Sequence, residues 1–419
     1  MKGDVPMVGK VYGVDLGTSL IKIYKKGKGI VVSQRNIIAI ENKKRLLAVG
    51  DVAYDMYEKA PESVVVSQPI RNGVIADIAN MERLFSEFMK QTTKTGKLQA
   101  SEYIVAIPID ITEVEKRAFV DLIEGSQAKV KRVRVVPKPI AACVGAGLNV
   151  NDARGIMMVD IGASTTEISV ISLGGIVISD LISIGGDTFN EAIITAMKKK
   201  FNLLIGNKTA FQLKRKLGNI ERIDETLTDS EKLAKEIEKY LEQDSKTRMD
   251  IDSENREKEN LSKEQDICDT NSLNIESVKE ENIDTNIDYK DNELEENKEI
   301  ENIKEMKVYG RNFLTGLPQQ VTVTSDIIVE AMKEPLESIM EAIKRILERT
   351  PPELSSDIID SGIYISGGSA TIKGIDKMVH DHTGLNVNVC DDPENAVVRG
   401  IGEIIENPSL DGLVSQYVK

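Results

Sequence analysis

The sequence Val14-Asp15-Leu16-Gly17-Thr18-Ser19 recurs in related form as Val159-Asp160-Ile161-Gly162-Ala163-Ser164-Thr165-Thr166. In both copies an apolar strand ends in an aspartate, and a glycine turn leads into another apolar run. The N–H groups of such a turn can bind phosphate, and the aspartate can hold Mg²⁺ through its water ligands. A single Asp-x-Gly after a strand is also ordinary turn chemistry. Two copies favour two related halves that face one nucleotide.

A third stretch, Ile363-Tyr364-Ile365-Ser366-Gly367-Gly368-Ser369, is an apolar strand that opens into a double-glycine turn. Because glycine has no Cβ, the backbone there can pass close under a flat adenosine. This turn supports the same prediction of a nucleotide site.

The order of these three elements is that of the superfamily of actins, heat-shock chaperones and sugar kinases. Within it the chain resembles the MreB family of bacterial actins, the rod shape-determining proteins. The resemblance extends from about residue 11 to residue 406, apart from one long interruption. It is carried by residues 15–31, 69–77, 108–117, 139–147, 159–175, 185–193, 350–360 and 391–402.

The resemblance implies an α/β fold with two actin-like (ribonuclease H-like) lobes around a nucleotide cleft, each with a smaller subdomain. We expect the first lobe in residues 1–150 and the second in residues 151–220 and 306–419, with the C-terminal helix returning to the first lobe. Residues 221–305 contain 29 acidic and 13 basic side chains and so carry a net charge of −16, whereas the whole chain carries −14. We predict that this segment is an acidic, largely disordered insertion.

Composition limits the cellular compartment in which this protein is expected and the classes of partner that it can bind. The chain has no run of 18 apolar residues, and residues 1–10 lack the pattern of a secretory signal. Its cysteines, Cys143, Cys268 and Cys390, share no metal-like spacing, and we expect a solvated helix end at His380 and His382. Basic residues are not clustered with aromatics, which argues against nucleic-acid binding. The sequence indicates a cytoplasmic protein, with membrane association left open.

Membrane contact has weak support. Proteins of the MreB family generally use an N-terminal amphipathic helix or an apolar pair in a loop of the first domain. The corresponding loop, residues 91–102, offers Leu98 followed by Gln99.

The resemblance implies ATP and Mg²⁺ as cofactors and assigns nucleotide-binding residues one by one. Mg²⁺ would be held through water by Asp15 and Asp160. Lys22 follows Asp15 at the spacing of a phosphate-contacting lysine in eukaryotic actin, and the alternative is a surface strand lysine. Phe211 stands where a ribose-contacting Glu is usual. The full set is Asp15, Gly17, Thr18, Ser19, Leu20, Lys22, Asp160, Gly162, Ala163, Ser164, Thr165, Gly186, Phe211, Lys214, Arg215, Gly367, Gly368 and Ser369.

Two departures from the family pattern weaken the expected ATP chemistry. Ala163 and Ser164 replace two glycines of the second phosphate turn, at a cost of about 1–2 kcal/mol each if their φ is positive. Lys138 stands before Pro139 where the family carries its water-positioning Glu. An ammonium has no acceptor for a proton, so we predict slow or absent hydrolysis and no catalytic residue. Lys138 would either form a salt link to the γ-phosphate or point to solvent.

The leading hypothesis is a cytoskeletal MreB-type protein whose head-to-tail filaments scaffold cell-shape determination and peptidoglycan synthesis. Its partners would be further copies of itself and morphogenetic or wall-synthesis proteins. The alternative is a hydrolysis-deficient paralogue that co-polymerises with or regulates a regular MreB. A sugar kinase is disfavoured, because residues 108–117 match the connecting segment of the MreB family.

Periodicity adds local predictions. We expect helices at residues 81–89, 111–122, 187–201, 208–217 and 326–347, the last with an apolar face at Ile327, Ala331, Ile339, Ile343 and Leu347.

Overall fold

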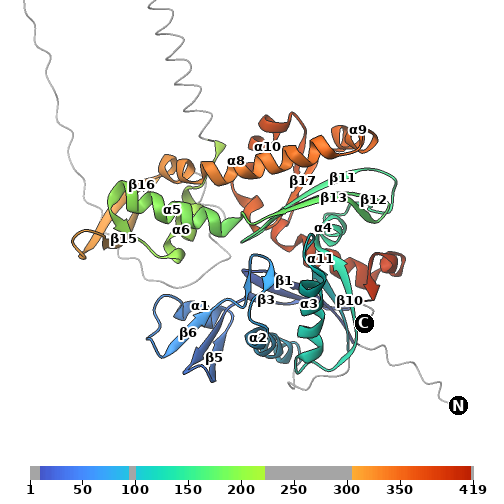
Figure 1. Ribbon diagram of the computed structural model, residues 1–419, viewed down its shortest axis with the longest axis horizontal. Coiled ribbons are helices and arrows are strands. Elements are labelled where there is room, and N and C mark those ends of the chain that lie inside the picture. The colour runs from blue at the N-terminus through green and yellow to red at the C-terminus, as the bar shows by residue number, and fades with distance from the viewer. Residues whose placement is uncertain (1–9, 94–100, 222–303, 417–419) are drawn as a thin grey trace, which may run out of the picture. The chain divides into compact units, whose positions relative to one another are not determined.

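The computed structural model describes residues 10–93, 101–221 and 304–416, all in one compact unit (Figure 1). The predicted insertion therefore falls almost wholly outside the described residues, as do Cys268 and Leu98.

The first sheet carries the first glycine turn. Its strands are β1 (Lys10–Leu16), β2 (Leu20–Lys25), β3 (Gly29–Arg35), β9 (Ser101–Ile107), β10 (Val130–Pro137) and β19 (Ser415–Gln416). Their spatial order is β19-β10-β9-β1-β2-β3. The β1–β2–β3 part is antiparallel, whereas β9 and β10 continue the sheet in parallel with β1.

The second sheet repeats this plan around the second glycine turn. Its strands are β11 (Ile156–Ile161), β12 (Thr166–Ser172), β13 (Gly175–Ile182), β17 (Ile363–Ser366) and β18 (Val387–Val389), in the order β13-β12-β11-β17-β18. Again three antiparallel strands are followed by two parallel ones. The duplication predicted from the two Asp-x-Gly segments is confirmed in the backbone.

Smaller sheets accompany each half. The first half has β4 (Ile38–Glu41), β5 (Arg45–Val49) and β6 (Val64–Ser67), together with β7 (Ile70–Arg71) and β8 (Val74–Ile75). The second half has β14 (Leu203–Leu204), β15 (Glu305–Asn312) and β16 (Pro318–Thr324).

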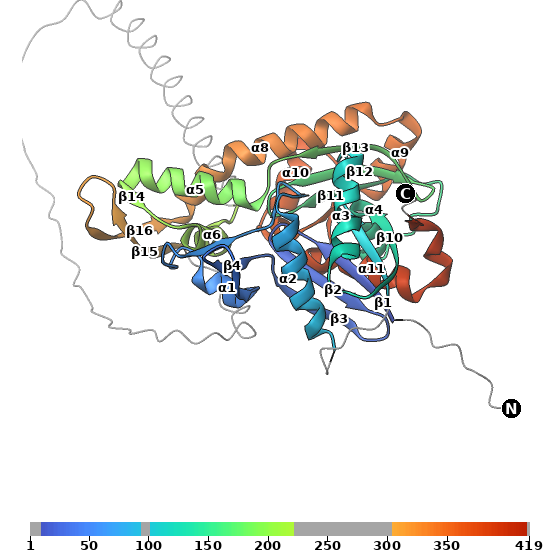
Figure 2. The ribbon, with the colours of Figure 1, turned by 60° about the horizontal axis from the view of Figure 1, so that its bottom comes forward.

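The helices surround both sheets (Figures 1 and 2). They are α1 (Asp51–Met56), α2 (Ile78–Gln91), α3 (Glu113–Gly125), α4 (Lys138–Gly145), α5 (Gly186–Phe201), α6 (Asn207–Leu217), α8 (Ser325–Arg349), α9 (Pro352–Ser361), α10 (Ile375–Thr383) and α11 (Ala396–Glu406). Short 3₁₀ turns are η3 (Gly368–Thr371), η4 (Pro393–Asn395) and η5 (Pro408–Leu413).

Helices α4 and α11 join the two halves. Helix α4 follows the first sheet but also contacts β11 and β12, and α11 follows the second sheet but contacts β1 and β2. A Cβ on Gly145 would lie 1.9 Å from the Ala396 carbonyl oxygen, and one on Gly400 would lie 1.7 Å from that of Ala141. The crossing is therefore possible only with glycine at both positions.

Separate apolar clusters stabilise these layers. One lies in the first half and includes aromatic side chains, with Tyr12 stacked on Tyr103 at 5.6 Å between ring centroids. Another surrounds α4 and α11 and includes Ile140, Met158 and Ile401. Burial of these side chains fixes α4, and hence Lys138 at its first position, against both sheets.

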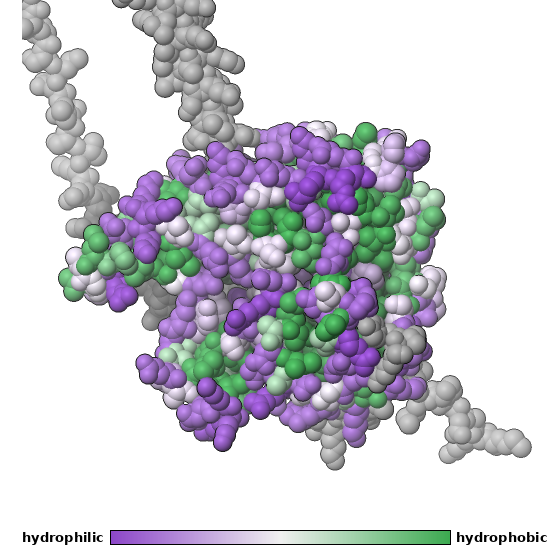
Figure 3. All heavy atoms as spheres, in the orientation of Figure 1, coloured by the Kyte–Doolittle hydropathy of each residue, from purple (hydrophilic) through white to green (hydrophobic). Residues whose placement is uncertain are grey.

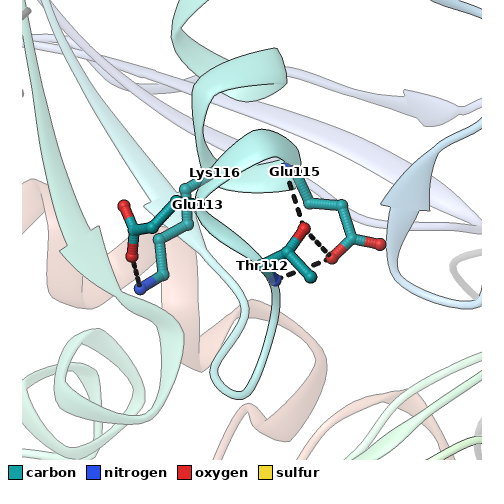
Figure 4. A network of polar contacts seen from close by, with 4 residues as sticks. All are labelled: Thr112, Glu113, Glu115 and Lys116. Atoms are coloured by element: carbon teal, nitrogen blue, oxygen red, sulfur yellow. Dashed lines mark hydrogen bonds and ion pairs between the residues drawn. The ribbon is translucent and has the colours of Figure 1, made fainter.

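Helix α3 begins with a capping box (Figure 4). The Glu115 N–H donates to Thr112 Oγ1 at 3.2 Å, and the Thr112 N–H donates to Glu115 Oε2 at 2.7 Å. Lys116 forms an ion pair with Glu113 at 2.7 Å. This cap anchors the turn before α3, and Ile109 lies in that turn.

Helix α8 corrects one sequence prediction. The helix is present, but its buried face runs through Ile328, Met332, Ile339, Ile343 and Ile346. Of the predicted face, Ile339 and Ile343 are buried, whereas Ile327, Ala331 and Leu347 are partly exposed. The predicted face was therefore off by about one position over the first turns.

Candidate functional site

The first predicted phosphate turn is a tight hairpin between β1 and β2. The Gly17 N–H donates to the Leu20 carbonyl at 3.0 Å. Asn36 is fully buried and fastens the turn, since its Nδ2 donates to the Gly17 carbonyl at 2.8 Å and its backbone N–H to that of Ser19. Thr18 is 9% exposed. Asn36 is not among the residues predicted from the sequence.

The second turn has the same closing bond, from the Gly162 N–H to the Thr165 carbonyl at 2.9 Å. Its Gly162 carbonyl accepts from Ser369 Oγ at 3.1 Å and from the Gly186 N–H at 3.0 Å. Three predicted segments, the turn at residues 162–165, Gly186 and Ser369, are thereby brought together.

The replacements at Ala163 and Ser164 cause no backbone strain. Neither residue has a positive φ, so the predicted cost of the missing glycines does not apply. Ser164 Oγ donates to Asp187 Oδ2 at 2.7 Å, so this hydroxyl is engaged within the protein. Burial raises the pKa of Asp187, while the Ser164 bond and Lys214 lower it.

Gly367 is required by the geometry of its turn. Its φ is +91°, and a Cβ there would lie 2.3 Å from Asp160 Oδ1 and 2.4 Å from the Ile161 carbonyl oxygen. Gly368, in contrast, has open space around it. The double-glycine turn is thus in close contact with the second predicted phosphate turn.

Five ionisable side chains gather near the two hairpins. Asp15 lies opposite Lys22 in the β1–β2 register, and Asp160 lies opposite Glu167 in the β11–β12 register. Lys138 at the start of α4 completes the group, which we call the charged cluster. Lys22 is 4% exposed and its Nζ donates to the Glu394 carbonyl, so it is not a surface lysine.

Lys138 does not point to solvent. Its Nζ lies 3.5 Å from Asp15 Oδ1, and its side chain is 12% exposed. Burial lowers the pKa of Lys138, but the carboxylates of Asp15, Glu167 and Asp160 outweigh that effect and raise it above its ordinary value. The ammonium is therefore fully charged at neutral pH.

The carboxylates of the second hairpin respond to the same surroundings. Burial raises the pKa of Asp160 to about 6, while Lys138 lowers it. Burial also raises the pKa of Glu167 to about 8, against the lowering effect of Lys138. Glu167 Oε2 accepts from the Ile109 N–H at 3.2 Å. Glu167 is not among the residues predicted from the sequence, although its spacing from Asp160 repeats that of Lys22 from Asp15.

Helix α6 supplies the remaining predicted residues. Lys214 is buried, its Nζ donates to the Gly186 carbonyl at 2.6 Å, and burial lowers its pKa to about 8 despite Asp187. Arg215 is exposed. The Phe211 ring lies 5.4 Å from Lys214 Nζ and 5.5 Å from Arg35 Cζ. Arg35 Cζ also lies 4.0 Å from the centroid of the Tyr54 ring, and neither residue was predicted from the sequence.

Within the described residues, no group of three or more His, Cys, Asp and Glu side chains is arranged to hold a metal ion. The predicted ligands Asp15 and Asp160 are both in the charged cluster, but the Lys138 ammonium lies beside Asp15. The cluster therefore does not fit the water-mediated Mg²⁺ site expected from the sequence. His380 and His382 are exposed near the end of α10 and bond to backbone carbonyls, as expected.

A cavity of about 420 Å³ lies elsewhere, between the end of α4 and α11, and includes Gly147, Cys390 and Arg399 in its lining. None of the predicted nucleotide-binding residues lines it. In the part of the chain that the structure describes, no helix is long and apolar enough to cross a membrane.

Comparison with known proteins gives a consistent result. A sequence profile of the MreB/Mbl protein family matches residues 9–231 and 264–411. The cell shape-determining protein MreB of Escherichia coli K12 is 31% identical over 405 residues, which cover 95% of this chain and 94% of that protein.

Solved structures agree on the fold. MreB5 of Spiroplasma citri bound to ADP has a TM-score of 0.72 and 25% identity, with 96% of this chain and 100% of that chain covered. A chain of the MamK double helical filament has a TM-score of 0.62 and 16% identity, with 95% and 99% covered. The predicted actin-like α/β fold is confirmed.

Proposed function

Because the chain belongs to the MreB/Mbl family of actin-like proteins, we propose that it is a cell shape-determining protein that forms filaments and binds ATP. Lobes formed by residues 1–150 and by residues 151–220 with 306–419 would enclose the nucleotide. The filament would act in the cytoplasm as a scaffold for peptidoglycan synthesis, together with other morphogenetic proteins. Direct membrane contact is not part of this proposal.

One observation carries the nucleotide part of the proposal. Both glycine turns close with the same bond and lie at matching places in duplicated sheets, and the Gly367 turn is packed against the second of them. Backbone N–H groups at such turns bind phosphate, and a glycine turn admits an adenosine. Nucleotide binding by MreB5, which was solved with ADP, supports the same function here.

Slow hydrolysis follows from Lys138. The residue that precedes Pro139 is a charged ammonium near Asp15, with no lone pair to orient an attacking water. Loss of a positioned base typically costs about 10²–10⁴ in rate. A phosphate-release assay on the full chain should therefore give a rate far below that of Escherichia coli MreB measured in parallel. Equal rates would refute this part of the proposal.

Self-association is supported by an apolar hairpin tip. Tyr309, Phe313, Leu314 and Leu317, at and near the turn between β15 and β16, are 51–73% exposed. Figure 3 shows green, hydrophobic surface at the left edge of the molecule, where Figure 1 draws the turn between β15 and β16. Exposed apolar patches mark interaction sites in soluble proteins. The same fold builds the MamK filament, which makes a second copy of this chain the natural occupant.

Sedimentation and electron microscopy test the filament directly. The full chain should pellet and show filaments, and Leu314→Asp should reduce the pelleted fraction. Leu173→Asp is the matched control, because Leu173 is 70% exposed in the turn between β12 and β13. Absence of filaments in the wild type, or equal effects of both variants, would contradict the proposal.

Lys138 also favours a second candidate function, a hydrolysis-deficient paralogue that co-polymerises with a regular MreB. In that case the chain should pellet weakly alone and strongly when mixed with the partner MreB.

A further inference from the structure

The charged cluster already contains two cationic side chains. Lys22 lies opposite Asp15 in the β1–β2 register, and Lys138 Nζ lies 3.5 Å from Asp15 Oδ1. Buried charges are tolerated where they are paired in this way. A dication added to the cluster would have to lie beside these ammonium groups.

The two lysines of the cluster are not equivalent. Lys22 Nζ is committed to the Glu394 carbonyl, which lies in η4 of the second half. Lys138 Nζ instead lies 3.5 Å from the carboxylate of Asp15, directly before the first glycine turn. At 3.5 Å this contact is an ion pair, and Asp15 Oδ1 has no hydrogen-bond partner among the described residues. An ammonium has three N–H donors, which can serve other acceptors.

The positive charge of Lys138 disfavours Mg²⁺ in the charged cluster. In nucleotide sites it keeps several waters and is bound by one or two carboxylates together with phosphate oxygens. Here the ammonium of Lys138 lies next to Asp15, one of the two expected carboxylates. A dication beside that ammonium would be repelled, and the buried surroundings weaken the screening of that repulsion.

We propose that Lys138 takes the place of the divalent cation, so that the chain binds the phosphates of an adenine nucleotide through the Asp15-held ammonium and without Mg²⁺. This inference rests on the proposed nucleotide binding and names the form of ligand that the site selects, the metal-free polyphosphate. The ammonium is covalently attached and already held near the two turns. Binding therefore does not require a hydrated Mg²⁺ to lose water.

Calorimetric titration of the full chain with ATP, in buffer with Mg²⁺ and in buffer with EDTA, tests the proposal. Wild type should bind at least as tightly in EDTA as in Mg²⁺. Lys138→Gln should lose about tenfold or more in EDTA and recover when Mg²⁺ is added, because Asp15 is then free to hold the hydrated ion. Lys138→Arg, which keeps the charge, should behave like wild type.

Lys131→Gln is the matched control, since Lys131 is exposed and forms an ion pair at 3.7 Å with Glu102 on the neighbouring strand. It should leave both affinities unchanged. A second measurement needs no variant: the electron paramagnetic resonance signal of Mn²⁺ should show no protein-bound ion when wild type is saturated with ADP.

The outcomes separate the two proposals. Wild type that binds ATP only with Mg²⁺, or that immobilises Mn²⁺ with ADP, would overturn the role of Lys138 and leave nucleotide binding intact. No binding in either buffer would overturn nucleotide binding itself.

Discussion

The β1–β2 and β11–β12 hairpins have the same backbone but different charges. Each is closed by an N–H to carbonyl bond of 2.9–3.0 Å across its glycine turn, and each places an aspartate on its first strand. The residue opposite that aspartate is Lys22 in the first hairpin and Glu167 in the second. The first hairpin therefore carries both signs of charge, whereas the second has two carboxylates side by side.

Because of this difference, the carboxylates of the second hairpin depend on a cation from the first half. Two facing carboxylates repel each other, and their ionisation in a buried site needs a cation. Lys138, which enters from α4 at the end of the first sheet, lies near enough to lower the pKa of both Asp160 and Glu167. The two hairpins thus share one backbone arrangement, and single side chains set the electrostatics of each hairpin.

The largest expected effect comes from removal of that cation. Lys138→Met keeps the length of the side chain but leaves buried carboxylates without their partner, so the free energy of unfolding should fall by about 3–5 kcal/mol. Urea denaturation near neutral pH measures the change. Lys131→Met, which breaks an exposed ion pair, should cost less than about 1 kcal/mol. Similar losses in both variants would show that the second hairpin does not need Lys138.

The next effect concerns the turn beside the second hairpin. Gly367→Ala would place a methyl group 2.3 Å from Asp160 Oδ1 at a φ of +91°. The left-handed conformation costs about 1–2 kcal/mol and the overpacking about 1–3 kcal/mol, so we expect a loss of roughly 2–5 kcal/mol.

Gly368→Ala is the internal control for this substitution. Nothing lies within 4 Å of the added Cβ, so its cost should stay below about 1 kcal/mol. The corresponding strand of the first half, β9, is followed by Pro108 rather than by glycine. If both alanine variants were equally stable, the tight contact between the Gly367 turn and Asp160 would be wrong.

Sequence predicted the duplicated frame but not its side-chain partners. The two Asp-x-Gly segments and the alternating apolar runs indicated the hairpins, because strand periodicity and glycine turns are local properties. The contact between Lys138 and Asp15, and that between Lys22 and Glu394, join residues over a hundred positions apart. Such pairings depend on how α4 and α11 cross, which no local pattern specifies.

The same limit explains the smaller errors. The cost expected at Ala163 depended on a φ that the sequence does not reveal, and the structure gives that residue no positive φ. The face of α8 was misplaced because Ile327, Ile328 and Val329 are all apolar, and packing against the sheet selects Ile328 and Val329 for burial.

A third prediction separates the hairpins by pH. Burial raises the pKa of Glu167 from 4.5 to about 8, so the folded state binds this proton more tightly than the unfolded state does. The resulting stability is fully present below about pH 4.5 and is lost as the pH rises through about 8. Glu167→Gln imitates the protonated form and should remove that loss.

Urea denaturation at about pH 5 and about pH 8.5 measures this slope. Wild type should lose stability relative to Glu167→Gln by at least roughly 1.4 kcal/mol, the value of one pKa unit. Glu102→Gln removes a partly buried carboxylate that pairs with the exposed Lys131, and it should keep the wild-type slope. A wild-type slope in Glu167→Gln would mean that Glu167 is ionised like an ordinary surface carboxylate.

The smallest expected effect concerns the hydrogen bonds to the carbonyl of each turn glycine. The Gly17 carbonyl accepts from the fully buried Asn36, whereas the Gly162 carbonyl accepts from Ser369 and also from the Gly186 N–H. Ser369→Ala therefore leaves the Gly162 carbonyl satisfied and should cost only about 0.5–1 kcal/mol in urea denaturation, against about 1–3 kcal/mol for Asn36→Ala. The reverse order would mean that the second turn depends on its side-chain bond more than the first, even though a backbone donor serves the same oxygen.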